Sequence, residues 1–425
     1  MNNQYYDLSI VIVANEDKSN FMDSLPQIHS TLSSLSILYE IIIVSRYANE
    51  YISNIIQKNN CNLIVSTDTG YGESVLSGIR HSTGNYIITM ESDQAHSVDV
   101  LKELWVARNT ADVIVASRYT INGQTKMPAI RKVLSRLLNF AFSRGLDLPM
   151  QDMSSGFRLY KSLIFKKITT LNDRFDFLQE ILVRILMEGY KIGEIPYTYK
   201  SNDPAYWRMF QFGIAYIGTF SRLWKLRNSI ASADYDARAY NAMMPPQRYW
   251  QRQRYKHITK MLNGKGRCLD IGCGSSRIIG ALPENSIALD ILLRKLRYSR
   301  RFGRATVQGS IFNLPIPSAS FPCVLCSQVI EHVPRLNVLD ELDRTLQPGG
   351  FLILGTPDYD KWQWNVIEWL YKVILPQAYA DEHITHYTFD ELYNEFISKR
   401  GYKLEETRYI LQGELILGLR KPPKF

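Results

Sequence analysis

The chain has 425 residues, of which 45% are hydrophobic, and a formal net charge of +9. This length allows about two or three domains with separate cores. No apolar run approaches the roughly 18 residues of a spanning helix, and residues 1–7 lack a signal-peptide pattern, so we expect a cytoplasmic protein. The five cysteines lack metal-site spacing, which favours reduced core thiols.

The first part of the chain alternates strands with helices. Apolar runs at 8–13, 39–44 and 62–66 predict strands, and the segments 21–38 and 70–81 have helical spacing. This alternation predicts an α/β domain whose parallel sheet binds ligands at the carboxyl ends of its strands.

A further predicted strand begins at Tyr86 and ends on two acids, Glu91 and Asp93. Residues two apart on a strand project to the same side, so the two carboxylates can share one divalent cation. Hard oxygen ligands suit Mg²⁺ or Mn²⁺ together with substrate phosphates. Short acidic pairs are common at strand ends, so this stretch taken alone favours an acidic turn after a core strand.

Six motifs follow one another in the first 200 residues. They are Ile12 to Glu16, Gly70 to Glu73 with Ser77 to Arg80, the acidic motif ending in Asp93, Ala116 to Tyr119, Asp152 to Arg158, and Glu194 to Tyr197. On these motifs residues 8–200 resemble the family 2 glycosyltransferases of the GT-A fold, particularly the dolichyl- or polyprenyl-phosphate mannosyltransferase-like branch.

The resemblance implies a metal-dependent transfer of a sugar from a nucleotide-sugar donor. Asp93 matches the family acid that holds the metal on the donor diphosphate, and Glu91 replaces its partner. The implied nucleotide-site residues are Ala14, Asn15 and Glu16. Arg118, Arg131 and Ser135 match positions that hold an acceptor phosphate, and Arg208 stands in for a lysine of the family.

Two positions carry open questions. A phosphate acceptor needs no general base, whereas a sugar hydroxyl does, and Asp152 is then the candidate base. Its alternative role is to brace the turn at Ser154 to Gly156. Ser45 and Arg46 stand where the family has two aspartates that grip the nucleotide.

Residues 206–224 are rich in aromatic side chains with basic residues at the ends. This composition suits a helix in a membrane interface, which would bring a lipid-phosphate acceptor within reach, and it equally suits interdomain packing. The small polar residues 228–233 mark a domain junction, giving domains 1–230 and 231–425. Residues 234–255, rich in tyrosine, tryptophan and arginine, are predicted to pack on the second domain.

The second domain opens with most of the excess positive charge. Its densest run, Arg294 to Arg304, is either a solvated helix face or a contact for nucleic acid, anionic lipid or phosphate. No nucleic-acid-binding motif accompanies the run, so we do not expect a nucleic-acid partner.

A strand enters a glycine loop at Asp270 to Ser276, and a second strand ends on Asp290. Glycines let the backbone approach a ligand closely, and an acid on the next strand can grip both ribose hydroxyls. By themselves these residues fit NAD as well as other nucleotides. Arg277 occupies the place of the third glycine in the dinucleotide fingerprint.

Later motifs follow in order at Gly309 to Pro315, Cys326 to Val333, Leu346 to Phe351 and Gly355 to Pro357. On these, residues 267–420 resemble class I S-adenosylmethionine-dependent methyltransferases. The resemblance places the methionine part of the cofactor beside Asp270, Gly272, Cys273 and Gly274, the ribose at Asp290, and adenine between Ser310 and Ile311.

Methyl transfer needs alignment more than acid or base help, unless the nucleophile is a hydroxyl. The candidate bases are His332, His383 and His386, each with a structural role as its alternative. Residues 362–371 with Tyr379 are either a lid over the acceptor or hydrophobic packing.

The sequence therefore predicts a bifunctional α/β enzyme with a glycosyltransferase domain and a Rossmann-like methyltransferase domain. Both would act on a glycan or a lipid-linked sugar, with peripheral contact to the cytoplasmic face of a membrane. The alternative is an inactive glycosyltransferase-like binding module joined to an active small-molecule methyltransferase.

Overall fold

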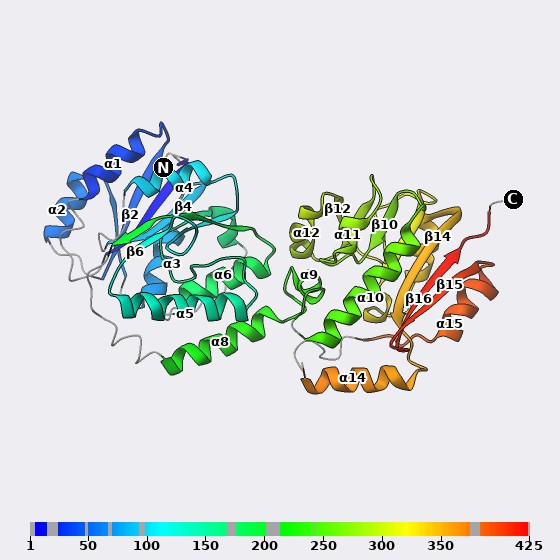
Figure 1. The fold of residues 1–425 in the computed structure, drawn as a ribbon. Coiled ribbons are helices and arrows are strands. Elements are labelled where there is room, and N and C mark those ends of the chain that lie inside the picture. The colour runs from blue at the N-terminus through cyan, green and yellow to red at the C-terminus, as the bar shows by residue number, and fades with distance from the viewer. Residues whose placement is uncertain are drawn as a thin grey trace. The chain divides into compact units, whose positions relative to one another are not determined.

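The computed structural model describes residues 5–14, 24–46, 50–66, 70–92, 98–166, 168, 176–200, 213–242, 244–374 and 383–423. Its contacts divide the chain into two compact units. The N-terminal unit is Met1–Leu186 with Tyr190–Arg227, and the C-terminal unit is Met187–Gly189 with Asn228–Phe425. Each unit contains a seven-stranded sheet covered by helices (Figure 1).

The N-terminal sheet has the order β3-β2-β1-β4-β7-β5-β8. Its strands are β1 (Leu8–Val13), β2 (Tyr39–Ser45), β3 (Asn62–Val65), β4 (Tyr86–Glu91), β5 (Val113–Ser117), β7 (Arg158–Lys161) and β8 (Ile192–Pro196). A separate parallel pair joins β6 (Gln124–Lys126) to β9 (Thr198–Lys200). The predicted strands and the α/β class are confirmed. The expected all-parallel sheet is wrong in one place, because β7 runs antiparallel to both β4 and β5.

Helices cover both faces of this sheet. They are α1 (Leu25–Ser33), α2 (Glu50–Lys58), α3 (Tyr71–His81), α4 (Asp99–Ala107), α5 (Ala129–Gly145), α6 (Phe177–Met187) and α8 (Gly213–Arg227), with the 3-10 helix η2 (Ser162–Lys166). Apolar residues of α1 and α4 join one face of β1, β2 and β4 in a single core. Helix α3 lies against the other face, where Gly78 meets Val11 and Val44 so closely that no larger residue fits.

The C-terminal sheet has the order β12-β11-β10-β13-β14-β16-β15. Its strands are β10 (Cys268–Ile271), β11 (Ile287–Asp290), β12 (Ala305–Gln308), β13 (Phe321–Ser327), β14 (Leu346–Pro357), β15 (Lys403–Ile410) and β16 (Glu414–Arg420). The first five are parallel, and the hairpin β15–β16 completes the sheet in antiparallel fashion. The strand order reverses between β10 and β13, which is where open α/β sheets bind ligands.

The helical elements of this unit are α9 (Tyr235–Ala239), α10 (Pro245–Leu262), α11 (Ile278–Ala281), α12 (Leu293–Ser299), α13 (Val338–Thr345), α14 (Trp362–Ile374) and α15 (Phe389–Tyr393). The unit also has two short 3-10 helices, η3 (Arg300–Phe302) and η4 (Ile330–His332), and a π-helix, η5 (Asn394–Lys399). Helix α10 belongs to the predicted segment 234–255 and does pack on this unit, since Trp250 and Ile258 enter the core of the sheet.

The five cysteines are free thiols, of which Cys61 is only partly buried and the other four are buried. No helix in the described part of the chain combines the length and apolar content needed to cross a bilayer.

Candidate functional site

The glycine loop after β10 has a backbone that only glycine adopts easily. Gly272 and Gly274 have φ of +69° and +55°, the left-handed region that L residues with side chains rarely occupy. A Cβ on Gly272 would lie 2.2 Å from Val329 Cγ2. The amides of Gly272 and Cys273 both donate to the carbonyl of Leu289, at 2.8 and 3.0 Å. The loop is therefore a tight turn fastened to the neighbouring strand.

Asp290, the last residue of β11, holds the loop from the other side. Its Oδ2 accepts the amide of Gly274 at 2.9 Å and its Oδ1 accepts the amide of Leu292 at 2.8 Å. The side chain of Asp270 is buried nearby. Burial, and secondly the charge of Asp290, raise the pKa of Asp270 to about 8. Asp270 is thus mostly protonated at neutral pH.

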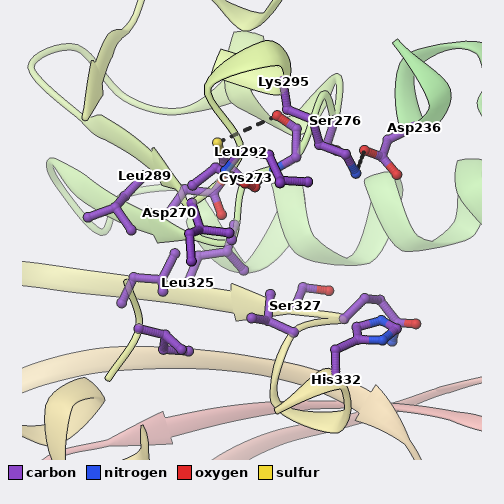
Figure 2. Close-up of a pocket in the computed structure, with 18 of the residues that line it drawn as sticks. Asp236, Asp270, Cys273, Ser276, Leu289, Leu292, Lys295, Leu325, Ser327 and His332 are labelled. Carbon is purple, nitrogen blue, oxygen red and sulfur yellow. Dashed lines mark hydrogen bonds and ion pairs between the residues drawn. The ribbon is translucent and has the colours of Figure 1, made fainter. Parts of the chain in front are cut away.

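These residues line a cavity of about 660 Å³ in the C-terminal unit. Ser310 and Ile311 form another part of its wall, and the Ser310 hydroxyl fixes the turn by accepting the amide of Phe312 at 3.3 Å. The structure thus brings together every residue predicted for the cofactor in this unit. Figure 2 shows Asp270 and Cys273 at the loop and Ser327 with His332 across from them.

Asp236 and Lys295 also line the cavity, and sequence reasoning missed both. Asp236 Oδ2 accepts the amide and the hydroxyl of Ser275, each at 3.0 Å. It also accepts a hydrogen bond from Lys295 Nζ at 3.1 Å (Figure 2). Burial opposes its charge, but Lys295 and Ser275 lower the pKa of Asp236. Lys295 belongs to the basic run Arg294 to Arg304, for which the sequence predicts either a solvated helix face or a contact for an anionic partner. The side chain of Lys295 is buried, so this residue of the run is not part of a solvated face.

A buried ion pair ties α10 to β16 beside the cavity. Arg254 Nε and Nη2 donate to the two oxygens of Glu414, at 2.6 and 2.8 Å, and the indole of Trp250 donates to the same carboxylate. Trp250 and Arg254 both line the cavity, whereas Glu414 is fully buried. The aromatic and basic composition of residues 234–255 is the sequence feature from which this part of the cavity wall could have been predicted.

Two of the three candidate bases lie at one end of the cavity. His332 and His383 line it, with ring centroids 4.8 Å apart. His386 instead stacks on Tyr359 at 4.0 Å. Residues 362–371, predicted to be either a lid or hydrophobic packing, differ in their surroundings. Trp364 is buried in the cavity wall, whereas Trp362 is 69% exposed. Tyr379 lies outside the described residues.

The N-terminal unit places its candidate site at the carboxyl edge of its sheet. Val13 pairs with both Val44 and Glu91, so the ends of β1, β2 and β4 meet there. Ala14 continues from β1 and donates its amide to Val44. Glu91 accepts a hydrogen bond from the hydroxyl of Tyr71, and burial followed by the Glu91 charge raises the pKa of Tyr71.

Four other residues predicted for this domain fall outside the described part of the chain. They are Asn15, Glu16, Asp93 and Arg208. Their roles, and the metal site that depends on Asp93, stay predictions.

Arg118 and Asp152 form a buried ion pair. Arg118 Nε and Nη2 donate to the two Asp152 oxygens, each at 2.7 Å, and the Arg118 amide donates at 3.0 Å. Asp152 also accepts the amides of Ser154 and Ser155, both at 3.2 Å. Burial alone would raise the pKa of Asp152, but Arg118 lowers it. This geometry favours the bracing role over the base role, and it directs Arg118 inward.

Arg131 and Ser135 lie on α5 and are partly buried. The hydroxyl of Tyr119 donates to that of Ser135 at 2.6 Å, and Arg118 lies over the Tyr119 ring. The motif at Ala116 to Tyr119 and the start of α5 are therefore neighbours in the fold, and the acceptor-phosphate role of Arg131 and Ser135 stays a prediction.

Comparison with known proteins matches each unit to a different family. Residues 9–169 match the glycosyl transferase family 2 model, and residues 269–354 match a methyltransferase domain model. The chain joins a family 2 glycosyltransferase domain to a methyltransferase domain.

The glycosyltransferase domain is similar to curated relatives. A dolichol-phosphate mannosyltransferase of Pyrococcus furiosus is 24% identical over 203 residues, which is 45% of this chain. An uncharacterized glycosyltransferase of Synechocystis sp. is 22% identical over 53% of this chain and 74% of its own length. The chain spans 56% of the length of the Pyrococcus protein.

The methyltransferase domain is similar to solved structures. A possible histamine N-methyltransferase of Thermotoga maritima is 20% identical, with a TM-score of 0.34, over 41% of this chain and 94% of its own. A putative methyltransferase of Haloferax volcanii, solved with its Trm112 activator, is 17% identical, with a TM-score of 0.36. The match covers 45% of this chain and 97% of the Haloferax chain.

A glycine substitution tests whether the loop of the methyltransferase domain is a ligand site. Gly272→Ala places a methyl group against Val329, so the loop must shift, and we expect S-adenosylhomocysteine binding to weaken at least about tenfold. The matched control is Gly264→Ala, whose φ of +73° imposes similar backbone strain with no atom within 4 Å of the new Cβ. Isothermal titration calorimetry measures both variants, and equal affinities would contradict the assignment.

Proposed function

We propose that the methyltransferase domain transfers a methyl group from S-adenosylmethionine to a sugar- or lipid-linked acceptor. The observation that carries the proposal is the glycine loop of Gly272 and Gly274, hydrogen-bonded to Asp290, in the wall of a 660 Å³ cavity. The absent Cβ atoms of the loop leave backbone close to the ligand, and Asp290 is an acceptor for ribose hydroxyls. The residues therefore fit this cofactor.

Different residues of the cavity would contact different parts of the cofactor. Gly272 and Gly274 would lie along the methionine part, Asp290 would hold the ribose, and Ser310 with Ile311 would flank adenine. When bound, the cofactor supplies an electrophilic methyl group. The cavity walls exclude water and align an acceptor with that group, which is most of what methyl transfer needs. For a hydroxyl acceptor, His332 and His383, which line the same cavity, would assist loss of its proton.

We propose further that the glycosyltransferase domain transfers a sugar from a nucleotide-sugar donor to a lipid-phosphate or glycan acceptor, with Mg²⁺ or Mn²⁺. The meeting of β1, β2 and β4 at one edge, with Glu91 on it, supports this proposal. Oxygen donors there suit a hard divalent cation, with Asp93 as the principal ligand. Such a cation stabilises the charge that develops on the leaving diphosphate.

The braced state of Asp152 favours a phosphate acceptor over a sugar hydroxyl, because a phosphate needs no base. The buried ion pair with Arg118 then serves to hold the turn at Ser154, beside α5. Arg131 and Ser135 on α5 would contact the acceptor phosphate.

Assays of the full chain separate two active domains from one. We expect Mn²⁺-dependent release of nucleoside diphosphate from at least one nucleotide sugar of a panel, abolished by Asp93→Ala. We also expect labelled methyl transfer from S-adenosylmethionine to a sugar- or polyprenyl-phosphate-linked acceptor, unaffected by Asp93→Ala. Methyl transfer without any metal-dependent release or nucleotide binding would instead support an inactive glycosyltransferase-like module.

An exposed apolar stripe on α5 supports peripheral contact with a membrane. Ile130, Val133, Leu137 and Phe140 recur every three or four residues and are 65%, 56%, 59% and 68% exposed. The same helix carries Arg131, Lys132, Arg136 and Arg144. Apolar and basic residues together suit an interface of anionic lipids.

The aromatic segment expected at the membrane, 206–224, is described only from residue 213, as part of α8. There Phe220 packs edge-on against Phe142 of α5, with ring centroids 5.4 Å apart. The described part of the segment thus shows packing within the N-terminal unit, while Ile217 is 71% exposed.

Vesicle flotation tests the membrane proposal. The full chain should float with phosphatidylglycerol–phosphatidylcholine vesicles, and Leu137→Asp with Phe140→Asp should lower the bound fraction at least about tenfold by removing apolar contact and adding repulsion. Val106→Asp is the control, because Val106 is 68% exposed on α4, away from the stripe. Equal loss in both variants, or no flotation of the wild type, would overturn the proposal.

A further inference from the structure

Three potential metal ligands meet at the acceptor end of the methyltransferase cavity. Glu331 and His332 come from the turn η4, and His383 comes from a segment some fifty residues later in the chain. One ligand atom from each of the three lies within 4.8 Å of the others. The later segment is fastened to η4, because the amides of Ile384 and Thr385 donate to the Glu331 carbonyl at 2.8 and 3.0 Å.

The carboxylate of Glu331 lacks a complete set of partners. The residue has no exposed surface, and its Oε2 accepts the Thr356 hydroxyl at 3.2 Å. Its Oε1 is buried with no hydrogen-bond partner among the described residues. A buried carboxylate oxygen without a partner is costly and needs either a proton or a cation.

The ring of His383 is held in place by two neighbours. Tyr359 Oη lies 2.5 Å from His383 Nδ1, and the Trp364 ring stacks on the imidazole with an interplanar angle of 22°. Hydrogen bonds of this kind, from outside the ligand shell, orient metal-binding imidazoles through the ring nitrogen that does not ligate. The contacts of His383 therefore match those of an oriented ligand.

We propose that Glu331, His332 and His383 bind one divalent transition-metal ion, with Zn²⁺ the best match. Two imidazoles and one carboxylate are a ligand set of catalytic zinc, which keeps a further position open. Metal–ligand bonds of about 2.1 Å in a tetrahedral site place ligand atoms roughly 3.4 Å apart. The ligand atoms now lie within 4.8 Å of one another, so metal binding draws them closer together.

The open position of this ion would face the cavity, since His332 and His383 both line it together with Gly272. A hydroxyl oxygen of the acceptor is the ligand that suits it, because a zinc ion binds and polarises oxygen ligands. This role for the metal rests on the proposed methyl transfer, whereas metal binding itself does not. The acceptor class is accordingly an alcohol, such as a sugar hydroxyl.

Metal binding can be measured without any turnover. The full chain carrying Asp93→Ala, which removes the predicted metal ligand of the other domain, is stripped with a chelator and titrated with Co²⁺ and Zn²⁺. We expect one equivalent of either metal, with visible d–d absorption of tetrahedral or five-coordinate Co²⁺. His383→Ala and Glu331→Gln should each weaken binding by more than the roughly 10- to 100-fold that loss of an outer-shell partner causes.

The control variant is His257→Ala, which removes an imidazole of α10 that does not line the cavity and should leave metal affinity unchanged. S-adenosylhomocysteine binding by each variant reports that the cavity is intact. No metal binding by a chain that binds S-adenosylhomocysteine, or metal binding that survives both ligand substitutions, would overturn the metal site. Metal binding without methyl transfer would overturn the proposed function alone.

Discussion

The methyltransferase domain depends on a left-handed glycine turn that has no room for a side chain. Val329 fills the space where a Cβ of Gly272 would lie, and Asp236 does the same at Gly274. Asp290 and Asp236 then fix the loop by accepting its amides. Close packing, positive φ and the two acids therefore act on the same few residues, which form one wall of the cavity.

In the glycosyltransferase domain, a buried ion pair holds a turn in place, whereas the glycine loop of the other domain depends on backbone conformation. The turn at Ser154 and Ser155 has its amides bound by Asp152, whose own charge is balanced by Arg118. Removing either partner would leave a buried charge uncompensated, which typically costs about 3–5 kcal/mol. This supporting role explains why Arg118, predicted to hold the acceptor phosphate, and Asp152, the candidate base, are buried against each other.

The sequence predicted features that follow from local rules and missed those that need two distant segments to meet. Strand ends carrying Glu91 and Asp290 could be read directly, because parallel strands bring their carboxyl ends to one edge. The antiparallel β7 could not, since strand direction depends on the path of the chain. Nor could Lys295 be told apart from the arginines around it, because its partner Asp236 lies 59 residues earlier. Likewise, only the fold brings His383 beside Glu331.

Electron density from crystals of the full chain grown with S-adenosylhomocysteine tests the assignment of the cavity most directly. We predict one ligand per chain, with its ribose hydroxyls on the Asp290 carboxylate, its adenine against Ser310 and Ile311, and its amino-acid end along Gly272 and Gly274. A ligand bound elsewhere, or a cavity that stays empty at saturating ligand, would contradict the account.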